Sequence, residues 1–313
     1  MHSTKTLLPQ LSGDLFLTDA GLETSLIFYD GVDLPCFAAF PLLETEDGRK
    51  KLSEYFRPFL QLARDRQIGF ILDTITWRAN ADWGLQLGYD AAALDRINQQ
   101  AVDFALELAR EFEGPTNPIV VNGVIGPRGD AYRPESLMSA DEAERYHGVR
   151  IATFSDTPAG MVTALTLTYV EEAIGIARAA RAHHIPLVLS FTVETDGRLP
   201  SGDTLQQAIE AVESATDASP AYYMINCAHP SYFRHALGGG AWRTRLLGLR
   251  ANASAKSHAE LDEATEIDAG DPLALAADYR ALLATLPKLS VLGGCYGTDY
   301  RHVEAIAAAW GTA

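Results

Sequence analysis

Two of the three cysteines in this chain stand where a predicted β-strand ends. Cys227 follows the apolar run 222–226, and Cys295 follows the run 289–292 and the pair Gly293-Gly294. Thiolates are preferred soft ligands of zinc, and a catalytic zinc site keeps one coordination position open for substrate. A free cysteine is more often a small buried hydrophobic residue, and the spacing alone leaves that alternative open. The pair is a candidate metal site only if the fold brings the two sulfurs together.

Eight short apolar runs supply the elements that would position these cysteines. The runs cover 15–19, 69–74, 118–125, 161–167, 186–192, 221–226, 246–251 and 289–294. They are continuously apolar rather than alternating, which is typical of strands covered on both faces. Segments of helical period separate them, with start signals at Asp90, at Ser139 to Glu142, at Asp203 and at Thr298 or Asp299. Eight βα units predict a closed (β/α)₈ barrel, a single domain over 1–313; a doubly wound open sheet is the alternative.

In a barrel, the residues that close the strands share one end of the molecule. They include Asp19, 73–77, 123–129, Glu194, 226–227, Asn252 and 293–298. Asp19 is a candidate for orienting a substrate ammonium group, although aspartate also favours turns. Gly293 and Gly294 would let the backbone approach a bound group closely. Lys256, in the polar loop 251–271, is conceivable as a Schiff-base lysine, but a solvated lysine is the commoner case.

Charge and composition exclude several classes of partner. The formal net charge is -16, from 25 Lys plus Arg against 41 Asp plus Glu. Such an acidic chain is not expected to bind nucleic acid or anionic membranes. It has no apolar run of about 18 residues and no apolar core of a secretory signal within 1–13. Three widely spaced cysteines favour a reducing cytoplasm over a disulfide framework. The oligomeric state stays open, with a homo-oligomer among the alternatives.

Several short motifs, taken in order, resemble those of the homocysteine S-methyltransferase family over nearly the whole chain. They are 18–24 (TDAGLET), 73–80 (DTITWRAN), 123–129 (GVIGPRG), 190–193 (SFTV), 226–227 (NC) and 293–299 (GGCYGTD). The resemblance implies a (β/α)₈ barrel with one catalytic zinc held by three cysteines. One of these follows an asparagine after strand six, and two adjacent ones follow Gly-Gly after strand eight.

Carried over by position, this ligand set is incomplete. Cys227 and Cys295 match two of the zinc ligands, but Tyr296 occupies the third position. Asp19 matches an aspartate that contacts the amino acid substrate, while Ala20 stands where glycine is usual. Leu165 occupies a place where some branches carry a glutamate that helps hold homocysteine. The resemblance also implies that Thr74, Trp77 and Asn226 lie at the substrate site.

The implied reaction is methyl transfer to a zinc-bound thiolate. Homocysteine, or a similar thiol or selenol, would fill the open position on Zn²⁺, lose its proton and attack a methyl group on a sulfonium or betaine-type donor, giving methionine. Trp77 and Tyr296 are candidates for an aromatic face that receives the cationic donor. Because two cysteines alone hold zinc weakly, His229 and Asp299 are candidates for a replacement ligand.

Two other functions remain as alternatives. The first is a metal-free, catalytically impaired barrel that binds a small amino acid or a sulfonium compound, which Tyr296 and Leu165 favour. The second is a lyase that forms a Schiff base through Lys256.

Overall fold

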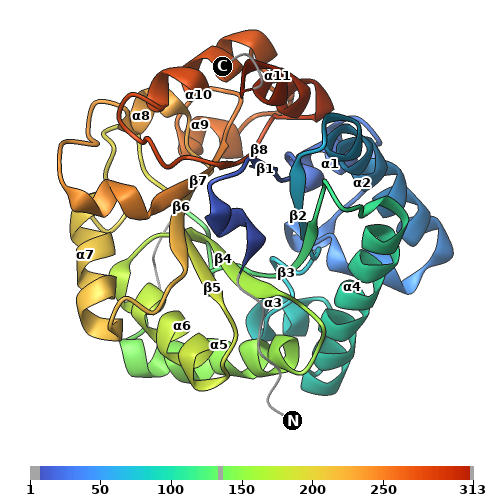
Figure 1. The fold of residues 1–313 in the computed structure, drawn as a ribbon. Coiled ribbons are helices and arrows are strands. Elements are labelled where there is room, and N and C mark those ends of the chain that lie inside the picture. The colour runs from blue at the N-terminus through green and yellow to red at the C-terminus, as the bar shows by residue number, and fades with distance from the viewer. Residues whose placement is uncertain (1–7, 133–136, 311–313) are drawn as a thin grey trace.

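Eight parallel strands close into a barrel in the computed structural model, which describes residues 8–132 and 137–310 (Figure 1). The strands are β1 (Phe16–Leu17), β2 (Gly69–Asp73), β3 (Ile119–Ile125), β4 (Met161–Leu167), β5 (Leu187–Phe191), β6 (Tyr222–Asn226), β7 (Leu246–Ala251) and β8 (Val291–Gly294). Each strand pairs with its neighbour in chain order, and β8 pairs with β1 to close the ring. All eight predicted strands are present, so the barrel prediction is confirmed and the open sheet is excluded.

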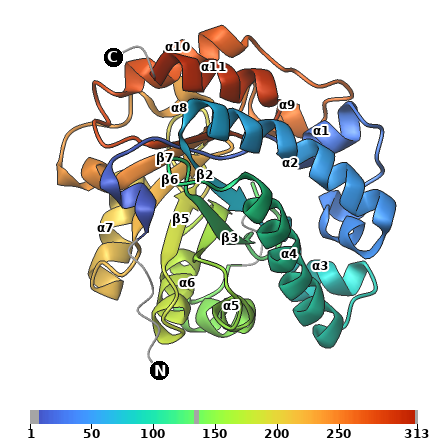
Figure 2. The ribbon, with the colours of Figure 1, turned by 45° about the vertical axis from the view of Figure 1, so that its right-hand side comes forward.

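The helices form a ring outside the strands (Figures 1 and 2). The α-helices are α1 (Leu22–Phe28), α2 (Glu46–Arg66), α3 (Ala81–Gln86), α4 (Ala91–Phe112), α5 (Ala140–Ser155), α6 (Val170–Ala182), α7 (Leu205–Thr216), α8 (Pro230–Phe233), α9 (His258–Asp262), α10 (Pro272–Leu282) and α11 (Tyr300–Trp310). The 3₁₀ helices within the described residues are η1 (Pro9–Ser12), η2 (Pro35–Phe37), η3 (Phe40–Glu44) and η4 (Ala241–Arg245). None of the helices within the described residues is long and apolar enough to span a membrane.

Side-chain caps set where several helices begin. The Asp90 side chain accepts a hydrogen bond from the Ala93 amide and caps α4, as predicted. Helix α7 begins one residue later than the signal at Asp203 suggested, because Thr204 forms a capping box with Gln207. Helix α11 begins directly after Asp299. The start signals in the sequence were therefore correct to within about one residue.

Ser139 and Glu142 form a capping box at the start of α5. The Ser139 hydroxyl accepts from the Glu142 amide at 3.3 Å, and the Glu142 carboxylate accepts from the Ser139 amide at 2.9 Å. Replacing Ser139 by alanine is expected to lower the free energy of unfolding by about 1 kcal/mol, because amides at the helix start lose their acceptor. Urea denaturation would measure the loss. Ser53→Ala, inside α2, is the control and should cost less, because the Ser53 hydroxyl accepts only from the exposed Arg57 side chain and caps no helix; equal losses in both variants would contradict the capping role.

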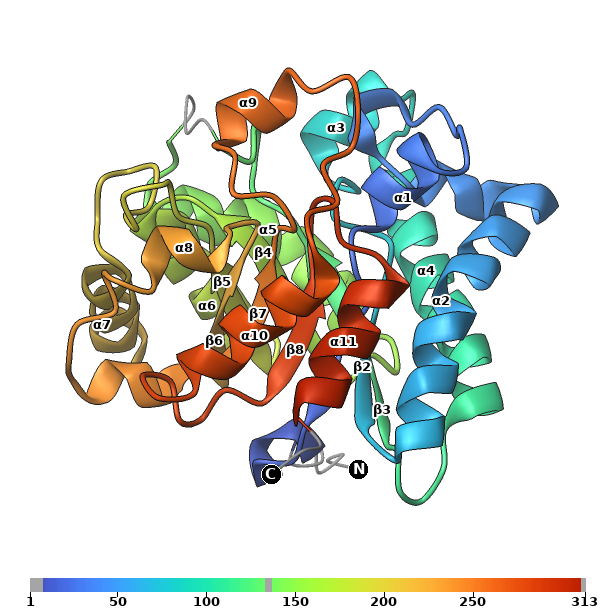
Figure 3. The same cartoon turned by 90° about the horizontal axis from the view of Figure 1, so that it is seen from above.

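The barrel interior is closed at its amino-terminal end by η1. This helix lies at the centre of the ring in Figure 1, and at the opposite end of the barrel from α3 and α9 in Figure 3. Gln10, on η1, is fully buried and donates to the Tyr222 hydroxyl at 3.4 Å. Phe16, Ile71 and Met224 belong to the apolar cluster above it. The carboxyl ends of the strands are therefore the end at which a ligand can enter.

Candidate active site

A cavity of about 110 Å³ lies at the carboxyl ends of the strands. Its lining comprises 19–24, Phe37, Phe56, 73–75, Trp77, Val124, Tyr132, Leu165, Thr166, Asn226, Cys227, Arg250, Cys295 and Tyr296. The lining includes all eight residues that the sequence singled out for the site, namely Asp19, Ala20, Thr74, Trp77, Asn226, Cys227, Cys295 and Tyr296. The volume suits a small molecule, since a site for one water needs only about a tenth of it.

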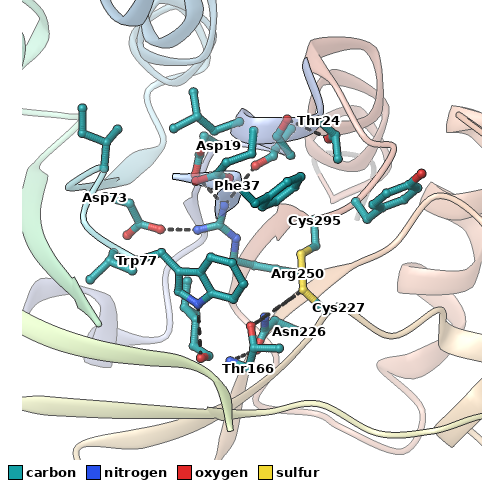
Figure 4. Close-up of a pocket in the computed structure, with 18 of the residues that line it drawn as sticks. Asp19, Thr24, Phe37, Asp73, Trp77, Thr166, Asn226, Cys227, Arg250 and Cys295 are labelled. Carbon is teal, nitrogen blue, oxygen red and sulfur yellow. Dashed lines mark hydrogen bonds and ion pairs between the residues drawn. A yellow bond between two sulfur atoms is a disulfide. The ribbon is translucent and has the colours of Figure 1, made fainter. Parts of the chain in front are cut away.

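The two cysteines meet in this cavity, from β6 and β8 (Figure 4). Their Cα atoms are 5.5 Å apart, and the sulfurs are joined as a disulfide, whereas Cys36 is a free thiol. The sequence favoured free thiols over a disulfide, so this expectation is wrong for Cys227 and Cys295. The barrel brings the pair together because strands six and eight each end at the same rim. Any metal would need both sulfurs reduced, since thiolates are the ligands.

Gly293 and Gly294 are needed for close packing rather than for a bend. Neither has a positive φ, but a Cβ on Gly293 would collide with Thr18, and one on Gly294 with Thr298. The glycines thus let β8 lie tightly against β1 and against the turn that follows Cys295. Their close approach is to the protein itself, and this is what positions the Cys295 sulfur.

Asn226 fixes the position of the Cys227 sulfur. Its side-chain amide donates to Cys227 Sγ at 3.2 Å and to Thr166 Oγ1 at 2.8 Å. Its carbonyl oxygen accepts from the Thr166 amide at 2.8 Å and from Ser190 Oγ at 2.6 Å. Asn226 therefore holds the Cys227 sulfur in place through its own hydrogen bonds to β4 and β5.

The backbone at Cys227 is held in a strained conformation. Its φ is 54°, in the left-handed region that favours glycine. The Cys227 carbonyl lies 2.6 Å from His258 Nε2 and accepts from Asn252 Nδ2 at 3.1 Å. His258 in turn lies 3.1 Å from the Glu194 carboxylate and stacks on Tyr132. The loop after β7 therefore reaches across the rim and fixes the turn that carries the cysteine.

Tyr296 fits the place of the third metal ligand poorly. Its hydroxyl is buried without a hydrogen-bond partner among the described residues. Burial raises the pKa of Tyr296 above its usual value of about 10, and the nearby charges of Asp268 and Asp262 add to the effect. The side chain is therefore a neutral phenol at physiological pH, which is a poor zinc ligand.

The other candidate ligands lie outside the cavity lining. His229 Nδ1 is 2.9 Å from Ser231 Oγ, and Asp299 pairs with Arg301 and His302. Within 8–132 and 137–310, no group of three or more His, Cys, Asp or Glu side chains is arranged to hold a metal ion. Catalytic zinc sites use three protein ligands. The two cysteines therefore do not fit the three-ligand zinc centre that the resemblance implies.

Arg250, on β7, is a site residue that the sequence motifs do not predict. Its guanidinium lies between Asp19 and Asp73 (Figure 4) and forms ion pairs with both, at 2.6 Å to Asp19 Oδ1. Its Nη2 also donates to the Ala20 carbonyl at 3.2 Å. All three charged side chains are buried. Arg250 thus holds the ends of β1, β2 and β7 together below the cavity.

Asp19 is already fully engaged within the protein. One oxygen accepts from Arg250 and the other from the Tyr55 hydroxyl at 3.1 Å. Burial raises the pKa of Asp19 to about 6, although the Arg250 charge acts in the opposite direction. The same is true of Thr74, whose hydroxyl accepts from the Val124 amide at 2.9 Å and lies 2.8 Å from Thr76 Oγ1. Both side chains line the cavity, but their polar atoms stabilise its floor.

Trp77, in the aromatic wall of the cavity lining, contacts a cation of the protein itself. The Arg78 guanidinium lies 4.3 Å from the ring centroid of Trp77 and 4.3 Å from that of Trp83. The edge contact between Trp77 and Phe37, with centroids 6.5 Å apart, completes the wall. Trp77, the residue expected to receive a cationic donor, thus already makes one cation–π contact within the protein.

Lys256 lies away from the cavity. Its ammonium group is 3.5 Å from the Asp268 carboxylate, and half of its side chain is exposed. It does not belong to the cavity lining. The placement gives no support to a Schiff-base mechanism.

Comparison with known proteins shows which family and which solved structures the chain is similar to. The family model described as homocysteine S-methyltransferase matches residues 16–310. A similar solved structure is the oxidized form of the homocysteine methyltransferase MmuM from Escherichia coli, with a TM-score of 0.74, 19% identity, and coverage of 95% of this chain and 96% of that chain. Its metallated form gives a TM-score of 0.73 at 18% identity with the same coverage. At such identity the likeness shows the fold. No curated protein sequence matches the chain.

Proposed function

The chain belongs to the homocysteine S-methyltransferase family, and we propose that it transfers a methyl group from a cationic donor to the sulfur of a small thiol. The proposed acceptor is homocysteine, with methionine as product, and the proposed donor is a sulfonium or betaine-type compound. The observation that carries the proposal is the convergence of Cys227 and Cys295, from separate strands, in a cavity that also holds several carboxylates.

The charges of the cavity support a cationic donor. Asp19, Glu23 and Asp73 line it, and Arg250 is the cation that lies among them. An excess of carboxylates in a site shielded from water attracts a positive ligand more strongly than the same charges do in bulk water. In the transfer, the acceptor thiolate forms a bond to the methyl carbon while the donor's carbon–sulfur or carbon–nitrogen bond breaks. The donor leaves as a neutral thioether or amine, so positive charge disappears from the site.

The proposal also includes a role for zinc in the methyl transfer. When bound, the metal would lower the pKa of the acceptor thiol and so supply a nucleophile at neutral pH. Since Cys227 and Cys295 do not complete a three-ligand site, we expect the reduced protein to hold zinc weakly. The incomplete ligand set also favours a second candidate function, binding of a small amino acid or sulfonium compound without turnover.

Methyl transfer by the reduced protein tests the first function. The protein would be incubated with homocysteine and, in turn, S-methylmethionine, S-adenosylmethionine or glycine betaine, with zinc added or chelated, and methionine measured by mass spectrometry. Cys227→Ser is expected to lower activity by about a hundredfold or more, because the sulfur that lies in the cavity is lost.

Cys36→Ser is the matched control, because Cys36 does not line the cavity and its substitution should leave activity unchanged. Donor or acceptor binding without methionine formation would favour the second candidate. If the protein shows no binding of donor or acceptor and forms no methionine, both candidate functions are contradicted.

A further inference from the structure

The carboxylates that line the cavity differ in how they are neutralised. Asp19 and Asp73 share Arg250, and Asp19 also accepts from Tyr55. Their hydrogen-bonding capacity is largely used inside the protein. A bound ligand that carries a cation would have to break these buried pairs in order to reach them.

Glu23 is the exception. It lies in the first turn of α1, lines the cavity and is partly accessible. Its carboxylate contacts its own backbone N–H. Among the described residues, no side chain donates a hydrogen bond to Glu23 or forms an ion pair with it at salt-bridge distance. Arg78, whose charge also acts on Glu23, instead donates to the Gly129 carbonyl at 2.8 Å and lies between two tryptophan rings.

The pKa of Glu23 reflects the lack of a cation beside its carboxylate. Burial raises its pKa to about 7, and the charge of Asp19 adds to the effect. Its own backbone N–H and the charges of Arg250 and Arg78 act in the opposite direction but do not offset the burial. Tyr132 and Tyr296 line the same cavity and are neutral near pH 7, because the usual pKa of tyrosine is about 10 and burial raises the pKa of each further. The site therefore lacks a cation beside one of its carboxylates.

The missing cation is best supplied by a primary ammonium group. A sulfonium or quaternary ammonium carries no N–H and gives a carboxylate only its charge, whereas a primary ammonium group also donates up to three hydrogen bonds. An amino acid substrate brings such a group into the cavity.

We propose that Glu23 is the residue that holds the α-ammonium group of the amino acid substrate, while Asp19 serves to position Arg250. The inference rests on the proposed function, because it assumes that the cavity takes an amino acid such as homocysteine or methionine. It assigns substrate recognition to α1 rather than to the carboxyl end of β1.

Binding of two probes that differ in one group tests the assignment. L-Methionine and 4-(methylthio)butanoic acid share the thioether and the carboxylate, but only the first carries the ammonium group. At pH 8, isothermal titration of the reduced wild-type protein is expected to show at least about a tenfold preference for L-methionine. In Glu23→Gln the preference should fall close to one, because the amide carries no charge.

The pH dependence separates this role from a structural one. Only the ionised carboxylate attracts the ammonium group, so the preference of the wild-type protein should grow as pH rises through about 7 and level off above it. Asp19, with a pKa raised to about 6, titrates nearby, so Glu23→Gln is the reference profile and should lack the rise near pH 7. Glu23→Asp should restore a preference that still grows with pH.

Three outcomes would overturn the inference. The first is that Glu23→Gln keeps the wild-type preference. The second is that Glu23→Asp fails to restore the preference although it unfolds at the wild-type temperature. The third is that the wild-type protein binds both probes equally. If any of these is found while the wild-type protein still forms methionine from homocysteine, the assignment of Glu23 falls and the methyltransferase function stands. If the wild-type protein also forms no methionine, both fall.

Discussion

Replacing Tyr296 by cysteine is expected to raise the zinc content of the reduced protein from well below one ion per chain to about one. The substitution would place a third thiolate next to Cys295, at the rim where Cys227 already lies. Three thiolates satisfy the usual requirement of a catalytic zinc site, whereas the present chain offers two thiols and a buried neutral phenol. The measurement is elemental analysis of protein purified with a reductant and without a chelator.

Two variants control this result. Tyr296→Phe removes the hydroxyl without adding a sulfur, so it should leave the zinc content low. Adding Cys227→Ser to Tyr296→Cys should return the content to the low level, because one of the three thiolates is lost again. Near-stoichiometric zinc in the unmodified chain would contradict the expectation and would mean that another group completes the site.

Replacing Arg250 by methionine is expected to lower the free energy of unfolding by about 3–5 kcal/mol at neutral pH. Methionine has a similar length but leaves Asp19 and Asp73 buried without their common cation. The loss should shrink at lower pH. A carboxyl whose pKa is raised in the folded protein binds protons there more tightly than in the unfolded chain, so stability falls as pH rises. For Asp19, stability already falls as pH rises from about 4 to 6. Without Arg250, the pH range over which stability falls extends upward.

Arg301→Met is the matched control. Arg301 pairs with Asp299 at the same 2.6 Å, but 62% of its side chain is exposed. A pair with one exposed partner contributes about 1 kcal/mol or less, and Asp299 keeps its contact with His302, so this variant should lose far less stability than Arg250→Met. Urea unfolding at pH 7.5 and pH 5, followed by tryptophan fluorescence, gives both comparisons. Equal losses in the two variants, or a loss at Arg250 that does not depend on pH, would contradict the role given to the buried network.

The strands could be predicted from the sequence because parallel strands covered on both faces are continuously apolar. The runs at 69–74 and 118–125 illustrate this, since β2 is buried along its whole length and β3 at every residue after Ile119. The rim residues followed from the fold, because every strand of such a barrel ends at the same side. This is why the two cysteines could be expected to meet although 68 residues separate them.

Arg250 was missed because it lies inside a run that was otherwise apolar. A charge within a buried strand requires a counter-charge, and this was the available signal. The partners of Arg250 could not be predicted to be Asp19 and Asp73, because the pairing depends on strand register and tilt, which short motifs do not specify. Glu23 stood inside a recognised motif, but its lack of a partner is a property of the assembled cavity. The short helix η1 has no hydrophobic period, so its closure of the barrel could not be predicted either.

The pairing of β1 with β8 and of Asp19 with Arg250 has a consequence for synthesis of the chain. Asp19 and Arg250 are 231 residues apart, so roughly 10–50 seconds of translation separate them on a ribosome. During that interval the growing sheet has an unpaired edge and the two aspartates remain hydrated. An edge strand that waits for its partner invites association with other chains, and a very short one presents few free backbone groups. The two-residue length of β1 therefore suits a strand that stays without its second neighbour until the last part of the chain emerges.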